Sequence, residues 1–191
     1  MKEHIDIFLP KTDEAQAERL RNQVLECPRV QQVVYVDGLR SSEALRNIAD
    51  STTADYVVLM VKDTWLELGE GALERLALVA HDSGAAMVYT DHWEKKRDDH
   101  GHWTTEKHPA IDYQLGSVRD DFDFGSVWLL RGDLLRQWAH DAASTNYVYG
   151  GLYDLRLFLS RQGELLHLNE LLYTEVETDT RASGEKQFDY V

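Results

Sequence analysis

Residues 5–38 read IDIFLPKTDEAQAERLRNQVLECPRVQQVVYVDG, and this stretch decides the fold class. Ile5 to Leu9 is a short β-branched and aromatic run ended by Pro10, which predicts a buried strand. Asp13 to Glu26 then places apolar residues among charges with the helical period of 3.6. Val33 to Val36 is a second β-prone run. A strand, a helix and a strand at this spacing form a βαβ unit, which predicts a parallel sheet.

The same alternation continues along the chain. The segment from Ser41 or Ser42 to Ile48 and the segment from Gly69 to His81 are predicted helices, and Tyr56 to Val61 is an uninterrupted buried strand. Tyr89 to Trp103 is polar, and its turn residues predict a hairpin tip at residues 98–101. The remaining predicted elements are strands at 86–89, 126–130 and 164–175 and helices at 132–139 and 153–161.

Composition limits the function classes. The 191 residues are 43% hydrophobic and 28% charged, which indicates one globular domain. The net charge of −14 opposes binding to nucleic acid or to an anionic membrane. No apolar run is long enough to span a membrane, and Met1 to Lys11 lacks a signal-peptide pattern, so we expect a cytoplasmic location. The β-prone end at residues 187–191 suggests that a further C-terminal region of the same protein is missing.

Four residues stand at expected carboxyl ends of strands: Pro10, Asp37, Asp63 and Asp91. In open α/β sheets ligands bind at this edge, so the coincidence indicates a site. The structural alternative is that each Asp is a turn or cap residue, which is common after a strand.

Several short motifs occur in a specific order. Residues 9–14 read LPKTDE, residues 36–38 read VDG, and residues 44–49 read ALRNIA. Later, residues 154–157 read DLRL and residues 172–173 read LY. In this order they resemble the family 2 glycosyltransferases of the GT-A fold, over roughly residues 4 to 175. The resemblance implies a single GT-A-like domain over residues 1–191, a three-layer α/β/α sandwich with a mostly parallel central sheet. It also implies a nucleoside-diphosphate sugar as substrate, a sugar acceptor, inversion of stereochemistry and a place in polysaccharide biosynthesis.

By this resemblance, Pro10, Asp13 and Asp37 lie against the nucleotide base and ribose, where a carboxylate accepts strong hydrogen bonds. Arg46 and Asn47 shape the same pocket, and Arg46 contacts a phosphate. A solvated helix residue is the alternative for Arg46.

The family's Asp-x-Asp motif, whose carboxylates hold Mg²⁺ or Mn²⁺, reads Val61-Lys62-Asp63 in this chain. Asp63 remains as a metal ligand, and Asp91 is a second candidate ligand. Lys62 either takes the place of the cation beside the diphosphate or is simply solvated. Metal dependence therefore stays open.

The family's acidic pair, which supplies the catalytic base, aligns with Gly151 and Leu152, and a leucine cannot accept a proton. Asp154 is one substitute for the base. Residues 116–125 read GSVRDDFDFG and offer others, because their carboxylates and aromatic rings could supply a base and a stacking platform. Within that segment Asp120 and Asp121 are candidate catalytic residues, and Arg119 is a candidate donor contact. The alternative is a charged surface loop.

Several histidines and carboxylates gather in the polar stretch, and together they could bind a metal ion. They match no closed zinc pattern, so a hairpin of solvated histidines is the favoured interpretation. The residues are His92, His100, His102, His108, Asp91, Asp98 and Asp99.

Two function classes remain. The first is a glycosyltransferase, favoured by the charged segment at 116–125. The second is a non-catalytic GT-A-like module that binds nucleotide or regulates the rest of its protein, favoured by the two lost carboxylates. The chain has no P-loop, no Gly-x-Gly-x-x-Gly and no Gly-x-Ser-x-Gly, which removes the common ATPase, dehydrogenase and serine hydrolase classes.

Overall fold

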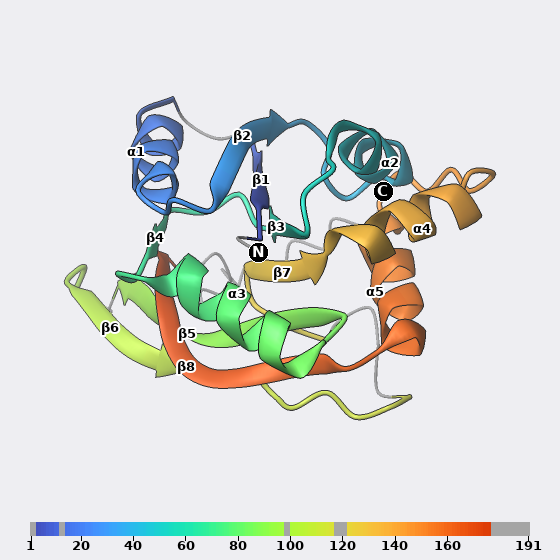
Figure 1. Cartoon of the computed structure of the whole chain (residues 1–191). Helices are drawn as coiled ribbons and strands as arrows, with labels where there is room; N and C mark the ends of the chain where they lie inside the picture. The colour runs from blue at the N-terminus through green and yellow to red at the C-terminus, as the bar shows by residue number, and fades with distance from the viewer. Residues whose placement is uncertain (1–2, 12–13, 98–99, 117–121, 177–191) are drawn as a thin grey trace.

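A computed structural model describes residues 3–11, 14–97, 100–116 and 122–176 (Figure 1). The strands are β1 (Ile5–Pro10), β2 (Val30–Val36), β3 (Tyr56–Met60), β4 (Leu66–Leu68), β5 (Met87–Arg97), β6 (Trp103–His108), β7 (Val127–Arg131) and β8 (Leu165–Val176). The helices are α1 (Glu14–Leu25), α2 (Ser42–Ser51), α3 (Ala72–Ser83), α4 (Gly132–Asp141) and α5 (Gly151–Gln162).

The described residues form one eight-stranded sheet in the order β2-β1-β3-β7-β5-β8-β4, with β6 paired to β5. β1 is parallel to both β2 and β3, and β5 is parallel to β8. β7 lies between β3 and β5 and is antiparallel to both. β4 and β6 are antiparallel to their neighbours as well, so β1, β2, β3, β5 and β8 run in one direction and β4, β6 and β7 in the other. The sheet is mostly parallel in this sense, and the carboxyl ends of β2, β1 and β3 meet at one edge.

Each face of the sheet carries its own hydrophobic core. Strand residues alternate between the faces, so Ile7 packs in the core that α1 and α3 cover, whereas Phe8 packs in the core under α2, α4 and α5. The two helical layers and the sheet between them make the three-layer α/β/α sandwich that the sequence predicts. The predicted fold class is confirmed.

The polar stretch after residue 89 contains a hairpin around the tip that the sequence predicts at residues 98–101, but the strands that flank the tip differ from the prediction. The strand expected to end at Tyr89 continues to Arg97 as β5, and β6 returns beside it to form a long hairpin. Hydrophobic pattern did not indicate these strands because much of this hairpin is half-buried or exposed. The three-residue strand β4 was also missed, since it is too short to show a period.

In the described part of the chain, every helix is too short or too polar to cross a membrane.

Candidate functional site

A cavity of about 560 Å³ lies at the carboxyl ends of β1, β2 and β3. Pro10 ends β1, Asp37 follows β2, and Asp63 follows β3, and all three line this cavity. Val61, at the first position of the altered Asp-x-Asp motif, lines it as well. The topology thus brings together Pro10 and Asp63, which are 53 positions apart in the sequence.

The turn after β2 forms one wall and is held by local hydrogen bonds. Gly38 has a φ of 64°, a left-handed conformation that glycine adopts without strain. Its carbonyl accepts from Ser41 N at 2.8 Å. The Ser41 side chain caps α2 by accepting from Ala44 N at 3.1 Å, as predicted. Asp37 is thereby presented at the mouth of the cavity, where its side chain is 78% exposed and pairs with Lys11 at 3.5 Å.

The opposite wall is residues 146–149, which come from the loop before α5. Tertiary hydrogen bonds join this loop to the turn: Ser42 N donates to Tyr147 O at 2.9 Å, and Gly151 N donates to Arg40 O at 2.9 Å. Tyr147 and Tyr149 are 49% and 75% exposed. Exposed aromatic rings beside a cavity are suited to stack on a planar ring.

Asn47, the other predicted nucleotide contact on α2, lines an adjoining hollow of about 430 Å³ that also contains Asp37 and Ser41. Of the sequence-predicted site residues, Pro10, Asp37, Asn47 and Asp63 therefore gather in one region. The predictions for Asp13, Arg119, Asp120 and Asp121 lie outside the described residues.

Two predicted residues have structural partners elsewhere. Arg46 Nη1 donates to the carbonyls of Ala142 and Thr145 at 3.1 and 2.6 Å, which ties α2 to the end of α4. Asp154 accepts from Trp138 Nε1 at 2.9 Å, between α5 and α4. Their assigned roles as phosphate contact and base remain predictions.

Asp91 lies inside β5 at a register shift with β8, and not at a strand end. Its Oδ1 accepts from Ala110 N at 2.8 Å and lies 2.7 Å from His167 Nε2. These contacts give Asp91 an anchoring role for the segment after β6, and its assignment as a metal ligand stays a prediction.

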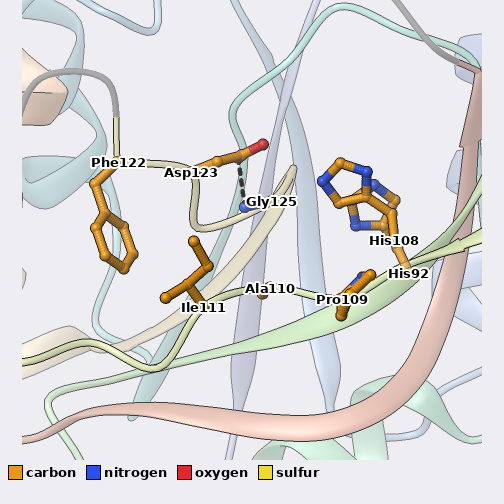
Figure 2. Close-up of a pocket in the computed structure, with 8 residues that line it drawn as sticks. All are labelled: His92, His108, Pro109, Ala110, Ile111, Phe122, Asp123 and Gly125. Carbon is orange, nitrogen blue, oxygen red and sulfur yellow. Dashed lines mark hydrogen bonds between the residues drawn. The ribbon is translucent and has the colours of Figure 1, made fainter.

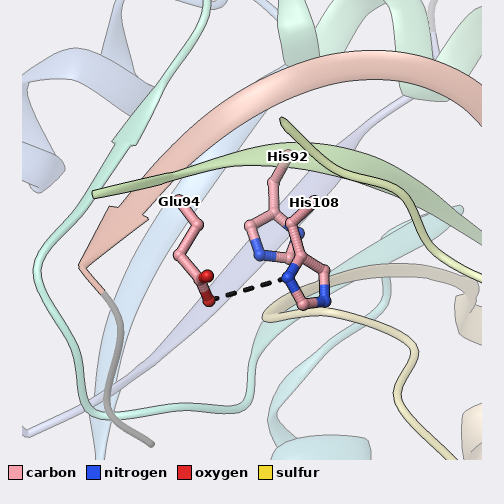
Figure 3. Close-up of side chains that lie close together, drawn as sticks. All are labelled: His92, Glu94 and His108. Atoms are coloured by element: carbon pink, nitrogen blue, oxygen red, sulfur yellow. Dashed lines mark ion pairs between the residues drawn. The ribbon is translucent and has the colours of Figure 1, made fainter. Parts of the chain in front are cut away.

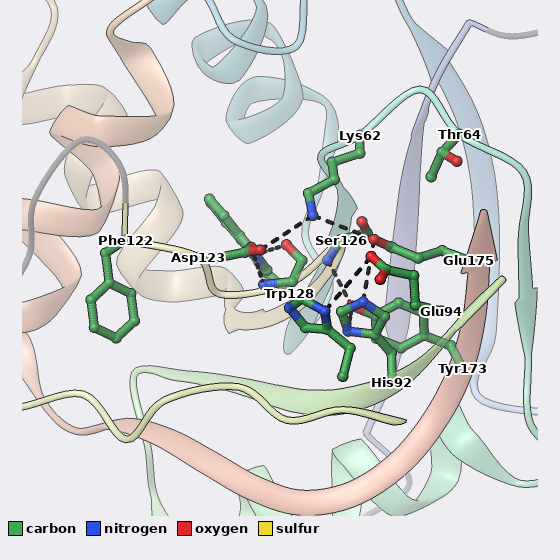
Figure 4. A network of polar contacts seen from close by, with 12 residues as sticks. Lys62, Thr64, His92, Glu94, Phe122, Asp123, Ser126, Trp128, Tyr173 and Glu175 are labelled. Atoms are coloured by element: carbon green, nitrogen blue, oxygen red, sulfur yellow. Dashed lines mark hydrogen bonds and ion pairs between the residues drawn. The ribbon is translucent and has the colours of Figure 1, made fainter. Parts of the chain in front are cut away.

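Lys62 is engaged by two carboxylates rather than solvated (Figure 4). Its Nζ lies 3.5 Å from Asp123 Oδ2 and 3.4 Å from Glu175 Oε1. Glu175 is buried on β8, and His92 Nε2 lies 3.3 Å from the same oxygen. Burial raises the pKa of Glu175, but the nearby His92 ring and the charge of Lys62 outweigh it, so the pKa is lowered.

A second cavity, of about 320 Å³, adjoins this network (Figure 2). Asp123 lines it, and the segment Pro109–Ile111, Phe122 and two histidines supply most of the remaining wall. Asp123 Oδ1 accepts from Gly125 N at 2.8 Å, which fixes the turn. Asp63 lines the first cavity and the adjacent Lys62 contacts Asp123 of the second, so residues 62–63 link the two cavities.

The positions of the family's acidic pair are closed to a carboxylate in this fold. A Cβ on Gly151 would lie 2.6 Å from Ser41 C and Ser42 N, a distance that packed atoms do not tolerate. Leu152 is 9% exposed and belongs to the core beneath α2, α4 and α5. The packing of α5 thus leaves no room for a carboxylate at the two positions that the sequence resemblance assigns to the pair.

The sequence did not identify Tyr147 and Tyr149, Asp123 as a cavity residue, or Glu175 on β8. The available signal for the first was an apolar aromatic run just before Gly150-Gly151, where the chain has no helical period. For Glu175 there was no local signal, since its partner Lys62 is 113 residues away.

No protein-family model matches the sequence, and neither does any curated protein sequence. Solved structures do match in fold. A mannosyltransferase from Pyrobaculum calidifontis in complex with GDP-Man and Mn²⁺ has a TM-score of 0.56 at 10% identity, over 93% of this chain and 57% of that one. TarS from S. aureus also has a TM-score of 0.56, at 12% identity, over 91% of this chain and 60% of that one.

A nucleotidyltransferase-type enzyme is similar as well. The 4-diphosphocytidyl-2C-methyl-D-erythritol synthase from Anaerococcus prevotii has a TM-score of 0.55 at 10% identity, over 88% of this chain and 90% of that one. The chain therefore spans less than two thirds of the two transferases but most of the synthase. At these identities the likeness shows the fold, and the fold of this chain is GT-A-like.

Proposed function

We propose that this chain is a nucleotide-sugar-dependent glycosyltransferase domain of the family 2 type. The observation that carries the proposal is the cavity of about 560 Å³ at the carboxyl ends of three adjacent parallel strands. Pro10, Asp37 and Asp63, which the sequence resemblance assigns to the donor, all line it. The structurally similar mannosyltransferase was solved with GDP-Man and Mn²⁺, which supports a nucleoside-diphosphate sugar as the donor class.

The charges around the cavity indicate how a diphosphate would be held. Lys11 and Arg40 are cationic, whereas Asp37, Glu43 and Asp63 are carboxylates. Because the acidic side chains outnumber the basic ones, a divalent cation would strengthen the binding of an anionic donor. Asp63 is the carboxylate that the Asp-x-Asp comparison assigns to such an ion.

The transfer step needs an acceptor hydroxyl and a base. We propose that the acceptor occupies the cavity of about 320 Å³, because residues 62–63 link it to the cavity proposed for the donor. Removal of the hydroxyl proton falls to a carboxylate of the 116–125 segment, with Asp120 and Asp121 as the predicted bases. The hydroxyl oxygen then attacks the anomeric carbon as the bond to the diphosphate breaks, which inverts the configuration.

Calorimetric titration with nucleoside diphosphates tests the donor site. We expect one of UDP, GDP, CDP or ADP to bind with a Kd in the micromolar range, as is usual for such substrates, and more tightly with Mn²⁺. Asp37→Asn should weaken binding about tenfold, because it removes a charge-assisted hydrogen bond. Asp82→Asn, an exposed change at the end of α3, is the matched control and should leave the Kd unchanged. Absence of binding to every nucleotide would exclude the proposal.

A second candidate is a nucleotide-binding module without catalysis. The packing at Gly151 favours this second candidate, because the Cα lies against the backbone of residues 41–42 and leaves no room for the acidic residue of the family. Measurement of nucleoside diphosphate release from a panel of nucleotide sugars separates the two. Binding with no turnover for the sugar of any bound nucleotide identifies the module, whereas turnover that Asp120→Asn or Asp121→Asn abolishes identifies the enzyme.

A further inference from the structure

The β5–β6 hairpin brings two histidines and a glutamate into one cluster (Figure 3). His92 on β5 and His108 on β6 are directly opposed in the antiparallel register. Glu94 stands two residues after His92 and therefore projects from the same face of β5. One ligand atom from each residue lies within 4.8 Å of the others, and His108 Nδ1 is 3.6 Å from Glu94 Oε1.

His92 is not a solvated histidine, so the favoured sequence interpretation is wrong at this position. Its side chain is 2% exposed, and its ring is stacked between Tyr173 and His108 with centroid separations of 4.8 and 4.6 Å. Such packing fixes the orientation of the imidazole. A ligand whose orientation is fixed in advance loses little entropy when it binds an ion.

The two nitrogens of His92 have different surroundings. Nδ1 lies 3.2 Å from Tyr173 Oη, which itself accepts from Ser126 N at 2.8 Å. Nε2 is buried and makes no hydrogen bond with the described residues, although Glu175 Oε1 is 3.3 Å away. When Nδ1–H donates to Tyr173 Oη, the lone pair of Nε2 is free to bind a cation, the arrangement usual for a metal-bound histidine.

Glu175 adds negative charge beside the cluster. Its carboxylate is buried, and its Oε2 has no hydrogen-bond partner among the described residues. Lys62 is the cation that faces it, and Lys62 is shared with Asp123. A buried carboxylate oxygen without a partner is costly, and a nearby divalent ion would compensate it.

We propose that His92, Glu94 and His108 bind a divalent transition-metal ion such as Zn²⁺. Two imidazoles and one carboxylate form a known zinc ligand set that keeps a fourth position open. Zinc–ligand bonds of about 2.0–2.2 Å place tetrahedral ligand atoms roughly 3.4 Å apart, so the side chains need only small rotations to close on the ion. Asp63 and Asp91, the metal ligands predicted from the sequence, are not part of this site.

The open position would face the cavity of about 320 Å³, because His92 and His108 line that cavity. An oxygen of a hydroxyl or anionic group in the cavity, or the Glu175 carboxylate, could complete the coordination. The site therefore belongs to the cavity proposed for the acceptor, and it stands whether or not the chain transfers sugar.

The test is direct metal binding by the whole chain after dialysis against a chelator. Titration calorimetry should show one Zn²⁺ bound per chain, and Co²⁺ at the same site should give the strong visible absorption of tetrahedral coordination. His108→Ala and Glu94→Gln alter half-buried residues, so they should fold while weakening the affinity at least about tenfold. His140→Ala is the matched control, since His140 is 91% exposed and lies beside Asp141 on α4.

The proposal predicts that His140→Ala keeps the affinity of the natural chain and the Co²⁺ spectrum. It is overturned if the natural chain binds neither ion, or if His108→Ala and Glu94→Gln both retain full affinity. Far-ultraviolet circular dichroism of each variant shows that a loss of binding is not a loss of fold. None of these measurements uses a nucleotide, so failure here and failure of the proposed function are separable.

Discussion

Tyr89 shows how one buried hydroxyl shapes the second cavity. Its ring is fully buried at the start of β5, edge-on to Phe124 and stacked on His167. Its hydroxyl donates to Ile111 O at 2.7 Å and accepts from Tyr113 N at 2.9 Å. Ile111 lines the cavity, so a single phenol holds that part of its wall in place.

We expect Tyr89→Phe to lower the free energy of unfolding at neutral pH by about 1–3 kcal/mol, because a buried N–H and a carbonyl lose their partner. Denaturant unfolding measures the change. Tyr149→Phe, which alters a largely exposed side chain, should change stability by less than about 0.5 kcal/mol.

The difference in stability between the natural chain and Tyr89→Phe should also depend on pH. Burial raises the pKa of Tyr89 to about 12, whereas the unfolded phenol titrates near 10. Between these values the folded state keeps a proton that the unfolded state has lost, so the natural chain loses stability as the pH rises from 10 to 12. Tyr89→Phe lacks this loss, and the stability gap between the two should narrow over that range. A difference in unfolding free energy that stays constant from pH 10 to 12 would contradict the raised pKa of Tyr89.

At the scale of elements, the start of α5 helps to build the wall of the cavity of about 560 Å³ and leaves no room for a side chain at position 151. Gly151 N bonds Arg40 O, and the absence of a side chain lets α5 approach the start of α2. The loop at 146–149 is thereby held over the carboxyl ends of β1 and β2. A carboxylate at position 151 would require α5 to move away from this wall.

Gly151→Ala is expected to destabilise the chain by about 1–3 kcal/mol, because its methyl group would meet the backbone of Ser41 and Ser42. Gly150→Ala is the matched control: its Cβ would meet Tyr147 at 3.5 Å, an ordinary contact. Because Gly150 precedes the first turn of α5, Gly150→Ala should lower the free energy of unfolding by less than about 1 kcal/mol. Thermal unfolding of both variants measures the two losses of stability. Equal losses would show that the close packing at position 151 does not cause the destabilisation.

At the scale of the whole molecule, charge and topology act together. The chain carries a net charge of −14, and Lys11 and Arg40 only partly offset the three carboxylates that line the cavity of about 560 Å³. The negative charge is spread over the rest of the protein, where like charges repel in the compact state. The folded state is therefore stabilised by any ion that screens this repulsion.

Raising NaCl from about 10 mM to about 150 mM shortens the screening length from about 30 Å to about 8 Å. We expect the Tm to rise by a few degrees, since the expanded unfolded chain gains less from screening than the compact one. Differential scanning calorimetry without divalent ions measures this shift. A Tm that falls with added salt would mean that attractive charge pairs outweigh the net repulsion.

Local pattern alone was enough to predict most of the fold. The period of 2 or 3.6 in residues 5–38 and its repetition determined the parallel α/β class, because burial on one face of a strand or helix leaves its mark in consecutive residues. The strand-end positions of Pro10, Asp37 and Asp63 were determined in the same way, since the carboxyl ends of neighbouring parallel strands share one edge. The part of the β5–β6 hairpin after His92 left no such mark because its residues are half-buried or exposed, and only the turn signal at 98–101 predicted a hairpin there.

Only the tertiary structure decided which distant groups meet. Lys62 joins Asp123 and Glu175, His92 joins His108 and Glu94, and Gly151 seats α5 against the 41–42 backbone. These contacts depend on strand register and on the order of strands in the sheet, which no local window of residues contains. The sequence by itself determined a GT-A-like sandwich and the strand edge where Pro10, Asp37 and Asp63 stand, and the packing of its elements determined which side chains line the cavity there.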